Sequence, residues 1–190
     1  MVYSLSQINR MDRSQLIQAL GEIFEHTPTV AAQVWCQRPF VSIEDLHQKM
    51  MTIVLGFDRE QKLALVRAHP DLGSKVKMAA ASVQEQSGAG LDRLSEDEYV
   101  RFQQLNRSYL EKFGFPFIVA VKNHTKSSII AAFDRRLQNS ADEELANAIE
   151  EISQIARFRL LAIIDSPSAK ADAVPKAGFA NANGDATRTS

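Results

Sequence analysis

Hydrophobic side chains recur every three or four residues along most of the chain, which is the spacing of one face of an α-helix. Polar capping residues precede most of these runs, and Ser95 with Glu98 and Ser140 mark the clearest helix starts. Gly56 and Gly114 follow two of the runs and suit helix ends. The pattern predicts helices over residues 16–26, 29–38, 46–55, 62–68, 96–113, 128–137 and 141–165, with a further apolar stripe of helical spacing at Val76, Ala79, Ala80 and Val83.

Strand signals are scarce in this sequence. The only run of β-branched residues is PFIVAV at 116–121, and a single strand would have no partner, so we expect an extended loop or the start of a buried helix. The sequence therefore predicts the all-α class, with a single compact multi-helix domain over residues 1–165. From Ser166 onward, Ala, Lys, Asp, Pro, Gly, Asn and Thr dominate, which predicts a flexible, disordered tail over residues 166–190.

Composition and charge narrow the class of protein. The 190 residues carry 22 basic and 23 acidic side chains without a basic block, so we expect no nucleic-acid binding. No window reaches the roughly 18 apolar residues of a membrane span, and MVYSLSQINRMDR does not resemble a secretory signal. The lone Cys36 is expected to pack beside Trp35 in a structural role, and the expected compartment is the cytoplasm.

The helical pattern is interrupted in four places by residues that could form a functional site. The first is RAHPDLGS at 67–74, where Pro70 pushes the preceding His69 out of helical geometry. His69 thus stands at a helix end on a rigid turn, and histidine is the side chain best suited to proton transfer near neutral pH. The alternative is a histidine that only caps the C-terminus of the helix.

The second interruption is the stretch Ser82-Val83-Gln84-Glu85-Gln86. Ser82, Glu85 and Gln86 are spaced i, i+3 and i+4, so they share one helix face beside the apolar stripe. A hydroxyl, a carboxylate and an amide on one patch can hydrogen-bond to a small polar ring. The alternative is a solvated helix end before the glycines that follow.

The third interruption is FGFPFIVAV at 113–121, a rigid apolar segment outside regular structure. Such a segment can leave backbone N–H groups free to bind a ligand. The alternative is a hydrophobic linker that fills the core.

The fourth interruption is Arg159, which projects from the middle of the apolar stripe of the last predicted helix. An arginine is almost never buried without a partner, so it must meet a carboxylate, carbonyl groups or an anionic ligand. A guanidinium is a natural clamp for a carboxylate or a planar urea-like group. The alternative is a structural ion pair with Asp71 or Glu85.

These four segments together resemble one known family. AHPDLG, SVQEQSGAGLDRLS, YLEKFGFPFIVAVK and IARFRL, in this order, are similar to the 2-oxo-4-hydroxy-4-carboxy-5-ureidoimidazoline (OHCU) decarboxylase family. The resemblance covers residues 5–165, and HPDL and FGFPFI are specific when EQ and RL occur at this spacing. It implies an all-α, usually homodimeric enzyme that converts OHCU to S-allantoin, the third step from urate to allantoin.

The resemblance also implies which residues act. His69 and Glu85 would be catalytic, and Arg159 would bind the substrate carboxylate. The substrate-binding set that the resemblance implies is Pro70, Ser82, Val83, Gln84, Glu85, Gln86, Phe117, Ile118, Val119, Ala120, Val121 and Arg159. We expect no metal and no cofactor, because the substrate has its own electron sink in the C=N bond of the ring.

Other classes of protein remain open at this point. A non-catalytic all-α module that binds a small polar ligand would keep Arg159 but could lose His69 or Glu85, and both are present. A protein–protein interaction domain would expose a large apolar patch, which a sequence cannot reveal. A metal enzyme is disfavoured because no i, i+4 pair occurs among the histidines, which are His26, His47, His69 and His124.

Overall fold

The computed structural model describes residues 2–73, 80–88 and 90–165, and this part of the chain is built almost entirely of helices. The elements are α1 (Leu5–Arg10), α2 (Arg13–Leu20), α3 (Thr29–Val34), a 3₁₀ turn (Trp35–Gln37), α4 (Ile43–Leu55), α5 (Arg59–Arg67), α6 (Ala80–Gly88), α7 (Glu96–Phe113), a second 3₁₀ turn (Val121–Asn123), α8 (Lys126–Arg136) and α9 (Ala141–Ile163). Two two-residue strands, β1 (Tyr3–Ser4) and β2 (Ile164–Asp165), pair in parallel. The predicted all-α class is confirmed.

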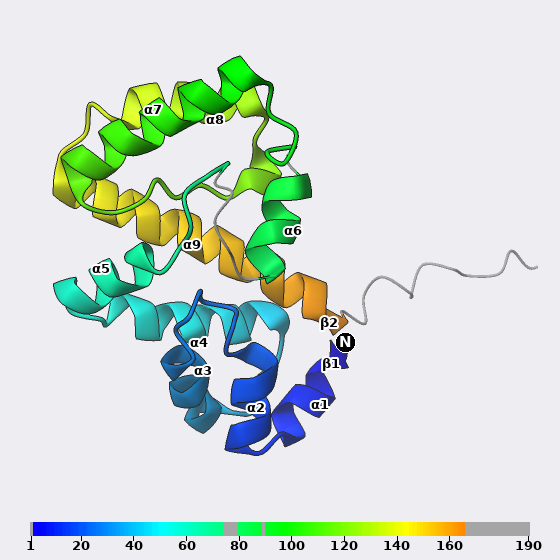
Figure 1. Cartoon of the computed structure of the whole chain (residues 1–190). Coiled ribbons are helices and arrows are strands. Elements are labelled where there is room, and N and C mark those ends of the chain that lie inside the picture. Colours follow the sequence, from blue (N-terminus) through cyan, green and yellow to red (C-terminus); the bar gives the residue numbers. More distant parts are fainter. Residues whose placement is uncertain (1, 74–79, 89, 166–190) are drawn as a thin grey trace, which may run out of the picture.

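Helix α9 runs through the middle of the fold. The pair α7–α8 lies on one side of it, and α4 and α5 lie on the other, with α1, α2 and α3 beyond them (Figure 1). Its apolar stripe is buried, and Ile152, Ala156 and Leu160 are almost fully shielded from solvent. Because both sides of α9 are covered, a polar side chain on its buried face must find its partners inside the protein.

Local capping explains where the helices begin and end. Ser95 and Ser140 both form capping boxes, with Glu98 and Glu143 respectively, so the predicted starts of α7 and α9 are confirmed. Gly114 closes α7 with a φ of 74°, in the left-handed region that glycine adopts without strain. This turn starts the segment that contains residues 117–121.

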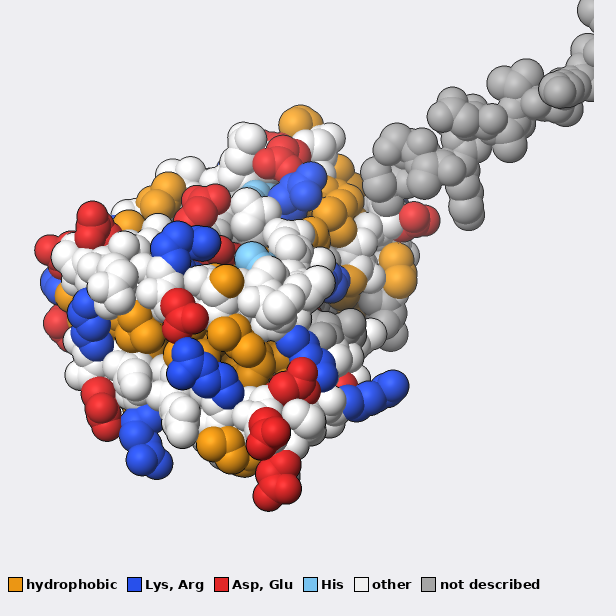
Figure 2. All heavy atoms as spheres, turned by 90° about the horizontal axis from the view of Figure 1, so that it is seen from above, with side chains coloured by type: hydrophobic (Ala, Val, Ile, Leu, Met, Phe, Trp, Pro, Cys, Tyr) orange, Lys and Arg blue, Asp and Glu red, His pale blue; other side chains and the backbone are white. Residues whose placement is uncertain are grey.

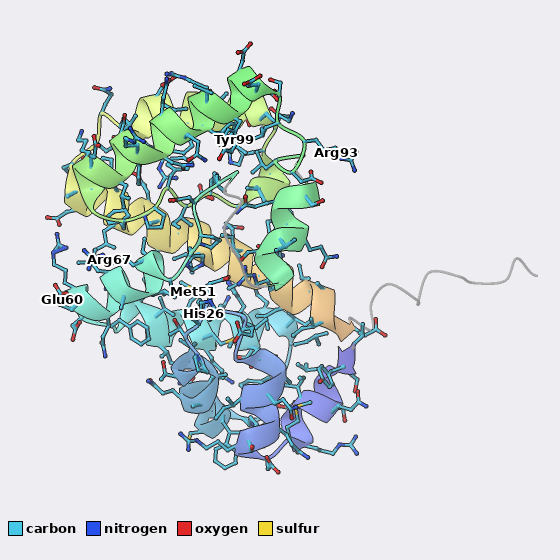
Figure 3. All side chains as sticks on the ribbon, viewed as in Figure 1. His26, Met51, Glu60, Arg67, Arg93 and Tyr99 are labelled. Atoms are coloured by element: carbon cyan, nitrogen blue, oxygen red, sulfur yellow. The ribbon has the colours of Figure 1, made fainter. Side chains whose placement is uncertain are left out.

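The predicted helix over residues 16–26 is wrong in its second half. Helix α2 ends at Leu20, and the residues that follow form a loop over 21–28 (the 21–28 loop). The apolar spacing misled the prediction because Ile23 and Phe24 are buried although they lie in a turn. His26 in this loop, labelled in Figure 3, has a φ of 48°, so the chain has left helical geometry there.

The prediction for Cys36 is also wrong. Helix α3 ends at Val34, and a 3₁₀ turn then leaves Cys36 exposed, whereas a packed, structural position beside Trp35 was expected. A 3₁₀ turn has three residues per turn rather than 3.6, so the α-helical phase no longer applies beyond Val34. The first helix, α1, was not predicted because its apolar pattern is only six residues long.

The face formed by α7 and α8 carries basic and acidic side chains that are interspersed (Figure 2), in keeping with the net charge of −1. None of the helices in the described part of the chain is long and apolar enough to cross a membrane. The predicted tail over 166–190 and the stripe positions Val76 and Ala79 lie outside the described residues. The domain boundary at residue 165 stays a prediction.

Candidate active site

All four interruptions of the helical pattern meet at one cavity, which the turn after α5, helices α6 and α9 and the 117–121 segment surround. The empty space in and around the cavity, including the open solvent at its mouth, is about 340 Å³. The cavity is lined by His69, Pro70, Leu72, Ser82, Glu85, Gln86, Phe117, Ile118, Val119, Val121, Ile155 and Arg159. Most of the predicted site residues are therefore brought together, and the exceptions are Val83, Gln84 and Ala120.

His69 is positioned by the end of α5 and the proline that follows. Its Nδ1 lies 3.0 Å from the carbonyl oxygen of Leu65, and a carbonyl can only accept, so Nδ1 carries the proton. Its Nε2 is buried and has no hydrogen-bond partner among the described residues. The ring therefore presents a free lone pair at Nε2 on the lining of the cavity.

Burial sets the protonation state of this ring. It lowers the pKa of His69 to about 4, although the Leu65 carbonyl and the charge of Glu25 act in the opposite direction. At neutral pH the imidazole is uncharged, so its Nε2 can accept a proton. A histidine that only capped a helix through the dipole would gain most from being charged, which disfavours the capping interpretation.

Arg159 is the buried cation of the site, with 6% of its surface exposed. Its Nε and Nη2 donate to the two carboxylate oxygens of Glu85 at 2.9 and 3.0 Å, which is a bidentate pair. Nη2 also donates to the Ser82 hydroxyl at 3.0 Å. Of the two partners that the sequence suggested, Glu85 rather than Asp71 holds the guanidinium.

Glu25 is a site residue that the sequence did not reveal. It lies in the 21–28 loop, is 1% exposed, and its carboxylate is 2.9 Å from Arg159 Nη2. The Ser82 hydroxyl donates to the same carboxylate at 2.8 Å. The only hint in the sequence is an acid directly after the apolar pair Ile23-Phe24, within a stretch that reads as helix.

Hydrogen bonds and charges together raise the pKa of Arg159. Burial alone would lower it, but Glu85 and Glu25 outweigh that effect. The guanidinium therefore stays charged inside the protein, and it is available to any anion that can displace one of these carboxylates.

Helix α6 presents the predicted face to the cavity. Ser82 and Gln86 are buried and Glu85 is half-buried, whereas the side chains of Val83 and Gln84 are exposed. Gln86 accepts from the backbone N–H of Gly73 at 2.9 Å, which ties α6 to the turn that follows the His-Pro motif. The prediction that Ser82, Glu85 and Gln86 share one helix face is confirmed. The side chains of Val83 and Gln84 point away from the cavity, so the structure does not support substrate contacts by these two side chains.

Residues 117–120 lie outside regular secondary structure, as expected, and Val121 begins the second 3₁₀ turn. The buried Arg136 and the partly buried Glu151 hold this segment. Arg136 donates to the carbonyl of Ile118 at 2.7 Å, and its guanidinium lies over the Phe117 ring. Glu151 accepts from the backbone N–H of Ala120 at 2.8 Å. These contacts fix the backbone at the edge of the cavity, which is what binding through main-chain groups would require.

The cavity combines an uncharged base with a cation and hydrogen-bonding groups. Within the described ranges, no three His, Cys, Asp or Glu side chains gather in a way that could hold a metal ion. The guanidinium suits a carboxylate, and the carboxylate, hydroxyl and amide groups of α6 suit the polar edges of a small ring. The arrangement can therefore bind a small polar anion and move a proton.

Known proteins share both the sequence and the fold. The chain matches the family model described as OHCU decarboxylase over residues 9–161. A 2-oxo-4-hydroxy-4-carboxy-5-ureidoimidazoline decarboxylase from Haloferax volcanii is 45% identical over 157 residues, which cover 83% of this chain and 94% of that protein. The uric acid degradation bifunctional protein PucL of Bacillus subtilis is 45% identical over 86% of this chain, which spans 33% of its length.

A solved structure agrees with these relatives. The crystal structure of an (S)-allantoin synthase matches with a TM-score of 0.68 and 32% sequence identity, over 85% of this chain and 54% of that one. The family match covers most of the described residues, including every segment that lines the cavity. The chain therefore belongs to the OHCU decarboxylase family.

Proposed function

We propose that this chain decarboxylates OHCU to S-allantoin with its own side chains and without a cofactor. The observation that carries the proposal is the free Nε2 of an uncharged His69 on a cavity that also holds the Arg159 guanidinium. Family membership and the names of the curated relatives support the same reaction. Urate degradation, the pathway named for the Bacillus subtilis relative, is the metabolic setting of the proposal.

The substrate carries a carboxylate and a hydroxyl on one ring carbon, C4, next to a ring C=N bond at C5. When the C4–CO₂ bond breaks, its electron pair forms a C4=C5 bond, and the ring nitrogen takes up one proton from solvent. The enol then becomes a ketone as its hydroxyl proton leaves oxygen and a proton is added to C5. The reaction needs orientation and proton transfer, which protein side chains can provide.

Each group of the cavity has a role in this scheme. His69 Nε2 accepts the proton of the C4 hydroxyl and delivers a proton to one face of C5, so a single enantiomer forms. Arg159 binds the carboxylate or the ring carbonyl, while Glu85 and Gln86 hold the hydroxyl and ureido groups. The backbone of residues 117–121 receives the remaining ring and urea oxygens.

The test is an optical assay. Urate oxidase and hydroxyisourate hydrolase generate the unstable substrate from urate, and the ellipticity of S-allantoin is followed with and without this protein. We expect rapid formation of one enantiomer, and we expect His69→Ala to lose it while the protein stays folded. Decay at the spontaneous rate to racemic allantoin would refute the decarboxylase and leave a small-ligand-binding module as the explanation of the cavity.

The proposal extends to assembly and compartment. We propose a homodimer in the cytoplasm, an inference that rests on the resemblance to the family and on the composition of the chain. Light scattering during size-exclusion chromatography measures the assembly, and a mass close to twice 21.2 kDa is the expected result. A monomer at working concentration would contradict it.

A further inference from the structure

Arg159 faces more negative charge than it can neutralise. One guanidinium is in contact with two carboxylates, Glu25 and Glu85, and the nearby His69 is uncharged. A substrate carboxylate can reach this guanidinium only if one of the two carboxylates gives way, because a third anion would add repulsion in a buried site. The two acids differ in their surroundings, and the difference indicates which one stays.

Glu25 is held on several sides. It is 1% exposed, accepts from the Ser82 hydroxyl at 2.8 Å, and does not line the cavity. The loop that carries it also supplies the backbone carbonyls of Glu22 and Ile23, which accept from Arg159 Nη1 at 3.2 and 3.4 Å. Moving Glu25 away would leave a buried carboxylate unpaired and the O–H of the buried Ser82 without its acceptor, which is costly.

Glu85 has a different environment. Its side chain is 15% exposed, and it lines the cavity with Arg159. It also lines a wider outer groove with Gln84 and Lys122, where Arg159 is again part of the wall. Glu85 thus stands between the cavity and the groove, and it can turn toward water without leaving a buried charge unpaired.

We propose that Glu25 is a positioning residue that anchors Arg159 permanently, while Glu85 releases the guanidinium to the carboxylate of the incoming substrate. Glu25 acts through Arg159 and Ser82 and does not touch the substrate itself. This assignment rests on the proposed function. The 21–28 loop, of which residues 21–26 were predicted to be helical, thus takes an indirect part in substrate binding through Arg159.

The experiment compares Glu25→Gln and Glu85→Gln in the optical assay described above. Glu25→Gln keeps the size of the side chain but removes the charge that holds the guanidinium, so KM should rise at least about tenfold while kcat changes by less than about threefold. Glu85→Gln should not raise KM, because the substrate then competes with a neutral amide for Arg159. It should lower kcat, because the carboxylate that holds the substrate hydroxyl in the proposed function is lost. Glu150→Gln makes the same chemical change on the exposed face of α9, where the carboxylate accepts a hydrogen bond from Gln154 and has no other partner in the described part of the chain. It should leave both constants unchanged.

Circular dichroism shows whether Glu25→Gln folds. If it does not, Glu25→Asp keeps the charge but withdraws it by one methylene, and a KM raised a few-fold would support the anchor. A folded Glu25→Gln or Glu25→Asp protein with the wild-type KM, or a Glu25→Gln protein that loses kcat alone, would overturn the assignment. An inactive wild-type protein would instead refute the proposed function, and this assignment with it.

Discussion

The substitution His69→Asn separates the proton-transfer role of the ring from its structural role. The amide nitrogen of asparagine can take the place of Nδ1 and keep the hydrogen bond to the Leu65 carbonyl, which lies 3.0 Å away, whereas nothing replaces Nε2. We expect kcat to fall by about 10²–10⁴-fold, the usual contribution of a general acid or base. KM should change little, because Arg159 and Glu85 are untouched.

The same substitution has a predicted effect on stability. Folding lowers the pKa of His69 from 6.5 to about 4 because the ring is buried, so the unfolded chain binds this proton more tightly than the folded chain. Above pH 6.5 the ring is uncharged in both states and contributes its full stability. As the pH falls from 6.5 to 4, the wild-type protein loses about 3 kcal/mol of unfolding free energy through this one group.

Urea unfolding of the two proteins, repeated between about pH 7 and pH 4.5, measures this loss. The His69→Asn protein lacks the titrating ring, so its unfolding free energy should fall less steeply over this interval than that of the wild type. If the unfolding free energies of the two proteins changed with pH in parallel, burial would not be what holds the ring uncharged. A kcat within about tenfold of the wild-type value would show that Nε2 is not the proton-transfer group.

Three further substitutions test the surroundings of the site. Arg159→Lys keeps the charge but loses the planar fork, paired here with Glu85, that would bind the substrate carboxylate, so KM in the optical assay should rise at least about tenfold. Glu144→Gln leaves the buried Arg136 guanidinium without its carboxylate and should cost about 3–5 kcal/mol in urea unfolding, whereas a neutral result would contradict the buried pair. Gly114→Ala places a Cβ at a φ of 74° and should cost about 1–2 kcal/mol of unfolding free energy. An unchanged unfolding free energy would contradict this prediction, because it would show that the turn changes its shape to accept alanine.

Features that depend on neighbours in the chain were predictable. Ser95 and Glu98, which form the capping box, are three residues apart. The left-handed turn at Gly114 likewise depends only on the last turn of α7, because the Gly114 N–H donates to the Leu110 carbonyl. The burial of Arg159 was also predictable, because an arginine inside an apolar stripe is carried into the core with its helix. Local geometry is set by local sequence, so these predictions needed no knowledge of the fold.

The partners of these groups could not be predicted in the same way. Arg159 and Glu85 are 74 residues apart, and Asp71 was an equally good candidate until α6 and α9 were placed against each other. Glu25 required the helix to stop at Leu20, although the burial of the residues that follow imitates a longer helix. Contacts between distant segments depend on how helices pack, and the sequence does not show that packing.

The sequence alone determined the helical class, the family and the residue types of the site, because periodicity and motif are properties of the chain itself. Only the tertiary structure decided that Glu25 completes the site and that His69 is uncharged with a free Nε2. Both facts arise from burial, which raises the free energy of any unpaired charge and depends on every segment that covers the residue.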